Sequence, residues 1–334
     1  MAEIGLIDVD SHNFPNLALM KISAYHKALG DNVEWCLPFK HYDIVYQSKV
    51  FDDTYTKDID YFPMADKIVK GGTGYFRREE DGTGYVYIRG IWVNIGSANS
   101  YTDGIETYNE FLPYEIEHIY PDYLLYSETI KNIENTAYGF LTRGCPRACK
   151  FCVVAGKEGR RSIKVADLSE FRNGQKHIKL LDPNTLACKQ HLNLLQQLVD
   201  SKAYVDFTQG LDIRLTNDAN IDLINKVKLK EIHFAWDNAK DDLKPYFEYY
   251  KSKAKHKPHG HYGTVYCLTN FDSTMEENLY RIYTVRDMKF NPYVMIYDKP
   301  NAPKEIRDLQ RWCNNKKIFN SCPDFREYKR RSGE

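Results

Sequence analysis

Three of the eight cysteines lie within one short segment, Gly144-Cys145-Pro-Arg-Ala-Cys149-Lys-Phe-Cys152, with the spacing C-x₃-C-x₂-C. Thiolates this close together repel one another and lose hydration, so the spacing indicates that a cation or an iron–sulfur cluster neutralises them. A four-iron cluster normally takes four cysteines. Because no fourth cysteine lies nearby in the sequence, one iron would remain open to an outside ligand.

The residues just before the cysteines predict how they are held. The run from Ala137 to Thr142 is short and rich in strand-forming residues, so we expect a strand there. The cysteines would then lie on a loop at the C-terminal end of a strand. Catalytic groups of α/β barrels gather on that face of the fold.

A structural zinc site is the alternative explanation of the cysteines. It would be completed by Cys188 or by a histidine such as His177. Zinc sites favour two ligand pairs, a C-x₂₋₄-C followed later by a second pair, and this sequence has no second pair with that spacing. On this alternative the chain is a non-catalytic α/β protein with a structural zinc.

The C-x₃-C-x₂-C spacing, with the aromatic Phe151 directly before the last cysteine, resembles the cluster loop of the radical S-adenosylmethionine (SAM) enzymes. The resemblance implies a [4Fe-4S] cluster on Cys145, Cys149 and Cys152, with S-adenosyl-L-methionine on the fourth iron. Such an enzyme reductively cleaves SAM to methionine and a 5′-deoxyadenosyl radical, which takes hydrogen from an unactivated carbon. It also needs an electron donor, such as a flavodoxin or a ferredoxin.

Six strand–helix units are expected from residue 136 onward. After the strand that precedes the cysteines, we expect strands at 177–181, 204–214, 231–236, 263–269 and 292–297, each followed by a helix. Cys188 is expected on the apolar face of the helix after the second strand. Six units resemble the open, partial (βα)₆ TIM-like barrel of the radical SAM family, which would cover residues 136–315.

An N-terminal domain of residues 1–75 is expected to be Rossmann-like, a small doubly wound parallel sheet. Strands are predicted at 3–10, 32–37, 43–46 and 67–70, with a helix at 16–29. This order, ending at Gly71-Gly72, resembles the cobalamin-binding-type domain that precedes the barrel in many radical SAM enzymes. The string Asp10-Ser-His12-Asn-Phe-Pro15 departs from the family's ligand motif, with proline where glycine is usual. Cobalamin therefore stays open as a further cofactor, and with it a cobalamin-dependent methyl transfer.

Two further segments complete the expected organisation. Residues 76–135 are predicted to be an insert and linker that contain a hairpin, and residues 316–334 a C-terminal tail. The resemblance implies SAM contacts where barrel strands end, although the family's glycine-glycine-glutamate string is missing. The expected cofactor-binding residues are Phe151, Asp182, Asn184, Arg214, Trp236, Asp237, Asn270 and Tyr297. No catalytic residue is assigned.

Charge and hydropathy limit the partners. Lys+Arg and Asp+Glu balance at 46 each, so no overall field attracts nucleic acid or an anionic membrane. No apolar run approaches the roughly eighteen residues of a membrane span, and the N-terminus lacks a signal-peptide pattern. We expect a cytoplasmic protein with reduced thiols and no membrane partner. The substrate is left open as a small molecule, a peptide or an RNA.

Overall fold

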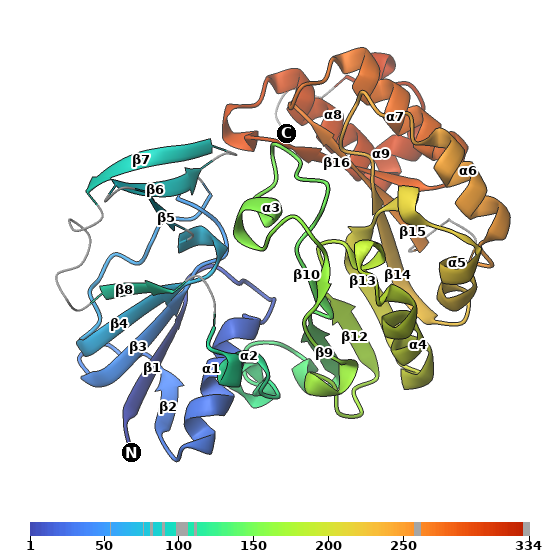
Figure 1. Cartoon of the computed structure of the whole chain (residues 1–334). Helices are drawn as coiled ribbons and strands as arrows, with labels where there is room; N and C mark the ends of the chain where they lie inside the picture. Colours follow the sequence, from blue (N-terminus) through green and yellow to red (C-terminus); the bar gives the residue numbers. More distant parts are fainter. Residues whose placement is uncertain are drawn as a thin grey trace. The chain divides into compact units, whose positions relative to one another are not determined.

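A computed structural model of the chain is shown in Figure 1. It describes residues 1–53, 55–75, 77–80, 83–88, 91–97, 106–109, 112–256 and 262–329, with backbone alone for residue 262 and for the strands between 77 and 109. The chain forms two compact units. The first comprises Met1–Gly139, Cys152–Lys157 and Ser169–Gln175, and the second comprises Phe140–Phe151, Glu158–Leu168 and Lys176–Glu334.

The first unit contains a five-stranded parallel sheet. Its strands are β1 (Glu3–Asp8), β2 (Asn32–Trp35), β3 (Tyr42–Ser48), β4 (Ala65–Gly71) and β8 (Glu106–Asn109), in the order β2-β1-β3-β4-β8. Helix α1 (Leu17–Ala28) begins at Asn16, whose side chain accepts a hydrogen bond from the Leu19 amide at 3.3 Å. The expected N-terminal α/β unit with a parallel sheet is confirmed.

After residue 75 the sequence predicts a two-stranded hairpin, whereas the structure has three strands. Strands β5 (Arg77–Glu80), β6 (Thr83–Ile88) and β7 (Ile91–Ser97) form a three-stranded antiparallel sheet. Strand β8 instead pairs in parallel with β4. Short helical turns follow at α2 (Tyr114–Glu117), Tyr123–Tyr126 and Ile133–Asn135. Residues 98–105 of the predicted insert lie outside the described residues.

A six-stranded sheet has its strands in simple chain order. The strands are β9 (Thr136–Gly139), β12 (His177–Leu180), β13 (Tyr204–Leu211), β14 (Lys228–Ala235), β15 (Tyr262–Thr269) and β16 (Asn291–Ile296). All pairings from β12 to β16 are parallel. This confirms an α/β fold with an all-parallel run of strands in the second unit.

Helices connect these parallel strands. They are α4 (His191–Ser201), α5 (Asp218–Ile224), α6 (Lys244–Lys253) and α7 (Met275–Asp287), with α8 (Lys304–Asn314) and α9 (Lys316–Ser321) after β16. Because crossovers between parallel strands are right-handed, strands added in chain order place their helices on the same face of the sheet. Phe234 of β14 shows this packing, since its ring lies 5.9 Å from Phe247 and 4.9 Å from Tyr250 of α6.

The two faces of this sheet differ in chemistry. The helix-covered face carries buried apolar side chains, such as Val205, Phe234 and Val265. On β14 the residues that alternate with Phe234 are Glu231 and His233, so they point to the opposite face. That second face is polar, and there the Tyr266 ring of β15 stacks on His233.

Two expected boundaries in the second unit are wrong. Cys188 is buried as expected but lies before α4 rather than on it, where its Sγ contacts Gln190 Oε1 at 3.3 Å. Strand β13 ends at Leu211 and does not reach Arg214, because the Asp212 side chain accepts a hydrogen bond from the Arg214 amide and begins a 3₁₀ turn.

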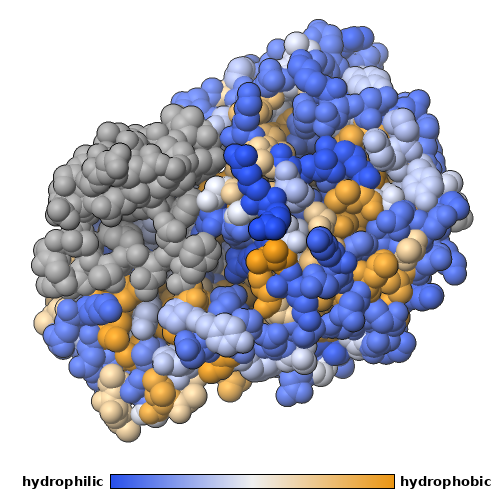
Figure 2. All heavy atoms as spheres, in the orientation of Figure 1, coloured by the Kyte–Doolittle hydropathy of each residue, from blue (hydrophilic) through white to orange (hydrophobic). Residues whose placement is uncertain are grey.

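The surface in view is mostly hydrophilic. Figure 2 shows hydrophilic residues over most of the described surface on this face, and its apolar residues lie in separate groups. Among the helices that the structure describes, none combines the length and the apolar character required to cross a bilayer.

Candidate functional site

The cysteine loop, residues 144–152, is held at its first residues by hydrogen bonds to other parts of the chain. Strand β10 (Thr142–Arg143) pairs antiparallel with β11 (Ile163–Lys164). Inside this pair, the Cys145 amide donates to the Gly159 carbonyl at 3.1 Å. The Glu158 carboxylate accepts from the Gly144 amide at 3.1 Å and from Arg143 Nη1 at 2.8 Å. The backbone therefore fixes the position of the first cysteine.

Gly144 is required by this geometry. Its φ is +82°, in the left-handed region, and a Cβ atom added there would lie 2.2 Å from the Arg161 carbonyl oxygen. A residue with a side chain would have to displace backbone, because the atom in the way is a main-chain carbonyl.

Asp182 ties the loop to the end of β12. Its Oδ1 accepts from the Leu141 amide at 2.8 Å, and its Oδ2 accepts from Thr142 Oγ1 at 2.7 Å. Thr185 Oγ1 also donates to Oδ2, at 3.2 Å. Burial raises the pKa of Asp182 to about 6, although these hydrogen bonds lower it. Both carboxylate oxygens already have partners in the protein, so Asp182 acts here as a positioning residue.

Asn184 contacts the first cysteine directly. Its Nδ2 lies 3.5 Å from Cys145 Sγ, within hydrogen-bonding distance for sulfur. The side chain is buried, and its Oδ1 has no hydrogen-bond partner among the described residues. The amide N–H group of Asn184 is therefore directed at the sulfur of the first cysteine.

Two arginines meet one carboxylate after β13. Arg147, inside the cysteine loop, donates from Nε to Asp212 Oδ2 at 2.5 Å. Arg214 donates from Nε to Asp212 Oδ1 at 2.8 Å, and its Nη1 reaches Asp241 Oδ2 at 3.0 Å. Burial works to raise the pKa of Asp212, but the hydrogen bonds and charges of the two arginines outweigh it and lower that pKa. A carboxylate ligand of Arg214 would therefore compete with Asp212 and Asp241.

The second cysteine is electrostatically coupled to this group. Burial opposes the positive charge of Arg214, but its hydrogen bond with Asp212 and the charge of Asp212 outweigh that effect and raise its pKa. The charge of Cys149 adds to the same rise. The positive charge of Arg214 therefore lies close enough to Cys149 to interact with it.

Aromatic rings link the loop to the ends of β15 and β16. The Phe151 ring lies 5.3 Å from Phe271, which in turn lies 4.9 Å from Tyr297. Asn270, with a φ of +63°, donates from Nδ2 to the Tyr297 carbonyl at 2.8 Å. The structure thus brings together Phe151, Asn270 and Tyr297, which the sequence predicted separately.

Trp236 and Asp237 follow β14 but differ in their surroundings. Trp236 is fully buried, donates from Nε1 to the Asp241 carbonyl at 2.8 Å and stacks 6.0 Å from Phe247. It belongs to the core, so its indole does not line the sheet edge. Loss of surrounding water raises the pKa of the Asp237 carboxyl to about 6. Asp237 is therefore the member of this pair with chemistry to offer a ligand.

None of the eight cysteines forms a disulfide, and all eight are described residues. Cys145, Cys149 and Cys152 are each half-buried, whereas Cys188, Cys267 and Cys313 are buried. Burial raises the pKa of Cys267 to about 12, so its thiol stays protonated. Cys145, Cys149 and Cys152 are the thiols of the motif, but the structure does not place their three Sγ atoms within 4.8 Å of one another.

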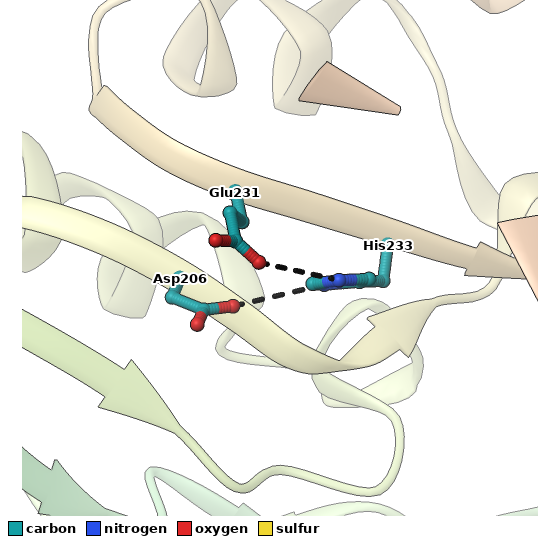
Figure 3. A group of neighbouring side chains, drawn as sticks. All are labelled: Asp206, Glu231 and His233. Atoms are coloured by element: carbon teal, nitrogen blue, oxygen red, sulfur yellow. Dashed lines mark ion pairs between the residues drawn. The ribbon is translucent and has the colours of Figure 1, made fainter. Parts of the chain in front are cut away.

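A second group of polar residues was not predicted. Asp206, Glu231 and His233 each place one potential ligand atom so that the three atoms lie within 4.8 Å of one another, as Figure 3 shows for their side chains. His233 lies 3.6 Å from each carboxylate, through Nδ1 to Asp206 and through Nε2 to Glu231. The signal in the sequence is the alternation of polar and apolar residues along strands β13 and β14.

No protein-family model matches this chain, and no curated protein matches it. Evidence on its function therefore comes from the cysteine spacing and from the contacts described above.

Proposed function

We propose that this chain is a radical SAM enzyme whose [4Fe-4S] cluster is held by Cys145, Cys149 and Cys152. One observation carries the proposal. The loop with the C-x₃-C-x₂-C spacing contacts residues that follow two parallel strands, through Arg147 to Asp212 after β13 and through Phe151 to Phe271 after β15. Asp182 after β12 accepts from the Leu141 amide just before the loop, and Tyr297 after β16 packs on Phe271. Ligand sites of parallel α/β sheets lie at this carboxyl edge.

The sheet supports the finer part of the proposal, a partial (βα)₆ barrel. Strands in chain order, with their helices on one face, build a sheet that curls around its other face. In this chain the other face carries Asp206, Glu231 and His233 instead of a hydrophobic layer. A polar interior suits a barrel that encloses a cofactor and a substrate.

The proposed roles of the protein residues follow from their contacts. A bound cluster would supply the electron for reductive cleavage of the SAM sulfonium. Asn184 would donate to the sulfur of Cys145, and Arg147 and Arg214 would offset negative charge around the loop. The rings of Phe151, Phe271 and Tyr297 would exclude water beside the cofactor. Asp237 and Asn270 would supply polar contacts at the same edge.

Iron and sulfide analysis tests the proposal. After anaerobic reconstitution we expect about four irons and four sulfides per chain. Cys149→Ala should lose the iron and its visible absorption while the protein stays folded. Cys322→Ala is the matched control, because Cys322 is also half-buried but lies far from the motif in sequence, and it should keep the iron.

Reduction in the presence of SAM provides the functional test. The reconstituted protein should form 5′-deoxyadenosine and methionine slowly even without its substrate. Absence of iron and sulfide from protein purified without oxygen, together with bound zinc that the Cys149→Ala variant loses, would overturn the proposal and favour the structural zinc alternative. The substrate, whether a small molecule, a peptide or an RNA, would then be sought with an electron donor such as flavodoxin or ferredoxin present.

A further inference from the structure

We propose that Asp206, Glu231 and His233 form a second metal site, which binds a divalent transition-metal ion through two carboxylates and one imidazole. The site lies on the polar face of the second unit's sheet, on strands β13 and β14. It shares no residue with the cysteine loop, and it does not depend on the function proposed above.

The burial of Asp206 is the first argument. The residue is 4% exposed, and its Oδ1 accepts no hydrogen bond from any described residue. In the pairing of β13 with β14, Asp206 stands directly opposite Glu231, so two carboxylates share one patch of the sheet. Buried negative charge is costly unless a cation or hydrogen bonds compensate it. A metal ion would supply that compensation.

The orientation of His233 is the second argument. Its Nδ1 lies 3.1 Å from the Phe207 carbonyl oxygen, which can only accept a hydrogen bond. Nδ1 is therefore the protonated nitrogen, and Nε2 presents its lone pair near Glu231 Oε2. The Tyr266 ring stacks on the imidazole at 5.2 Å with an interplanar angle of 4° and holds its plane. Metal-binding histidines are commonly oriented by this kind of hydrogen bond to a backbone carbonyl.

The dimensions and the donor atoms select the class of ion. Bonds of roughly 2.0–2.2 Å in a tetrahedral site separate the ligand atoms by about 3.4 Å. The potential ligand atoms here lie within 4.8 Å of one another, so small side-chain rotations would close the site. A set of two oxygens and one nitrogen suits zinc or another borderline divalent ion. Three protein ligands leave one position for water or for an oxygen of the substrate.

A lysine competes for the same carboxylates. Burial and the charge of Glu231 raise the pKa of Asp206, while the charges of His233, Lys179 and Lys230 lower it. Lys179, on β12, stands opposite Asp206 in the strand register. If the Lys179 ammonium group already compensates the charge of the two carboxylates, zinc binding to them would be weak. The experiment therefore has to measure zinc itself.

Zinc binding to a full-length variant with no thiol site tests the proposal. In the iron-free variant Cys145→Ser/Cys149→Ser/Cys152→Ser, equilibrium dialysis should find one zinc per chain. Adding His233→Gln or Asp206→Asn should weaken binding at least tenfold. His177→Gln is the matched control, because His177 lies on β12 and stacks on Tyr204 instead, and it should leave binding unchanged.

Thermal melting separates lost binding from lost folding. Zinc should raise the melting temperature of the triple-serine protein and should not raise that of the His233→Gln variant. If the two buried-site variants do not fold, Glu231→Gln decides, because Glu231 is only half-buried and the change keeps its shape. Absence of zinc from the triple-serine protein, or equal binding by the folded variants, would overturn the proposal.

Discussion

Asn184 is the residue through which the reduction potential of the proposed cluster can be tested. Its Nδ2 donates toward Cys145 Sγ at 3.5 Å from a buried position. A hydrogen bond to a cluster ligand stabilises the reduced, more negative state, so removing it should make reduction harder. The sequence placed Asn184 near the cofactor through its position after a strand, but it could not show that the amide reaches a cysteine.

We predict that Asn184→Leu lowers the midpoint potential of the reconstituted cluster. Loss of one charge-assisted hydrogen bond corresponds to a shift of about 60 mV or more for a one-electron couple. A titration followed by electron paramagnetic resonance measures the potential. Ser162→Ala is the control, because Ser162 donates only to the backbone carbonyl of Asn184, at 2.8 Å. A potential equal to that of the unmodified protein would remove the amide from the cluster environment.

At the scale of elements, the cysteine loop depends on its glycines to different degrees. Gly144 and Gly159 both have positive φ values, +82° and +93°. A Cβ at Gly144 would lie 2.2 Å from a backbone carbonyl, whereas nothing lies within 4 Å of a Cβ at Gly159. A side chain would therefore strain the backbone at both positions, but only at Gly144 would its Cβ collide with another atom. The two glycines form a matched pair for mutation.

We predict that Gly144→Ala loses most of its reconstituted iron, while Gly159→Ala keeps it. Both variants should lose about 1 kcal/mol or more of unfolding free energy, since alanine is strained at positive φ. Iron content per chain and a urea titration give the two readouts. Equal iron in both variants would mean that the loop tolerates displacement of the Arg161 carbonyl.

Much of the second unit was predictable because its elements obey simple periods. The strands around Phe207, Phe234 and Val265 place apolar residues at every second position, between helical patterns, and that period is typical of strands. Strand ends were less predictable, because Asp212 turns the chain through a side-chain hydrogen bond to the Arg214 amide. The proposed second metal site is not evident from the sequence, because pairing between strands, which no single segment encodes, brings Asp206 opposite Glu231.

At the scale of the whole molecule, the open question is what the first unit contributes. Its sequence pattern predicts a cobalamin-binding-type domain. In the structure, a depression of about 270 Å³ lies beside Gln47 of β3 and Lys70 of β4. That volume is small for a corrinoid. Gly72 packs against the backbone, since a Cβ there would lie 2.3 Å from the Lys49 carbonyl oxygen. Glycine at position 72 is therefore explained by the tight turn after β4.

We predict that the protein does not retain hydroxocobalamin near one per chain. The test incubates the reconstituted protein with hydroxocobalamin, desalts it and records the corrinoid bands in the visible spectrum. A corrinoid-binding protein of known stoichiometry, treated in parallel, controls for loss during desalting. Stoichiometric retention would contradict this expectation, and it would make methyl transfer to carbon the leading reaction.

The hydrogen bonds around Cys145 also suggest an order for folding and cluster insertion. The Leu141, Gly144 and Cys145 amides donate to Asp182, Glu158 and the Gly159 carbonyl. Every one of these partners belongs to the polypeptide, so this end of the loop can take its shape during synthesis, before any iron arrives. Delivery of the proposed cluster would then be a late step, made to a loop whose first cysteine is already in position.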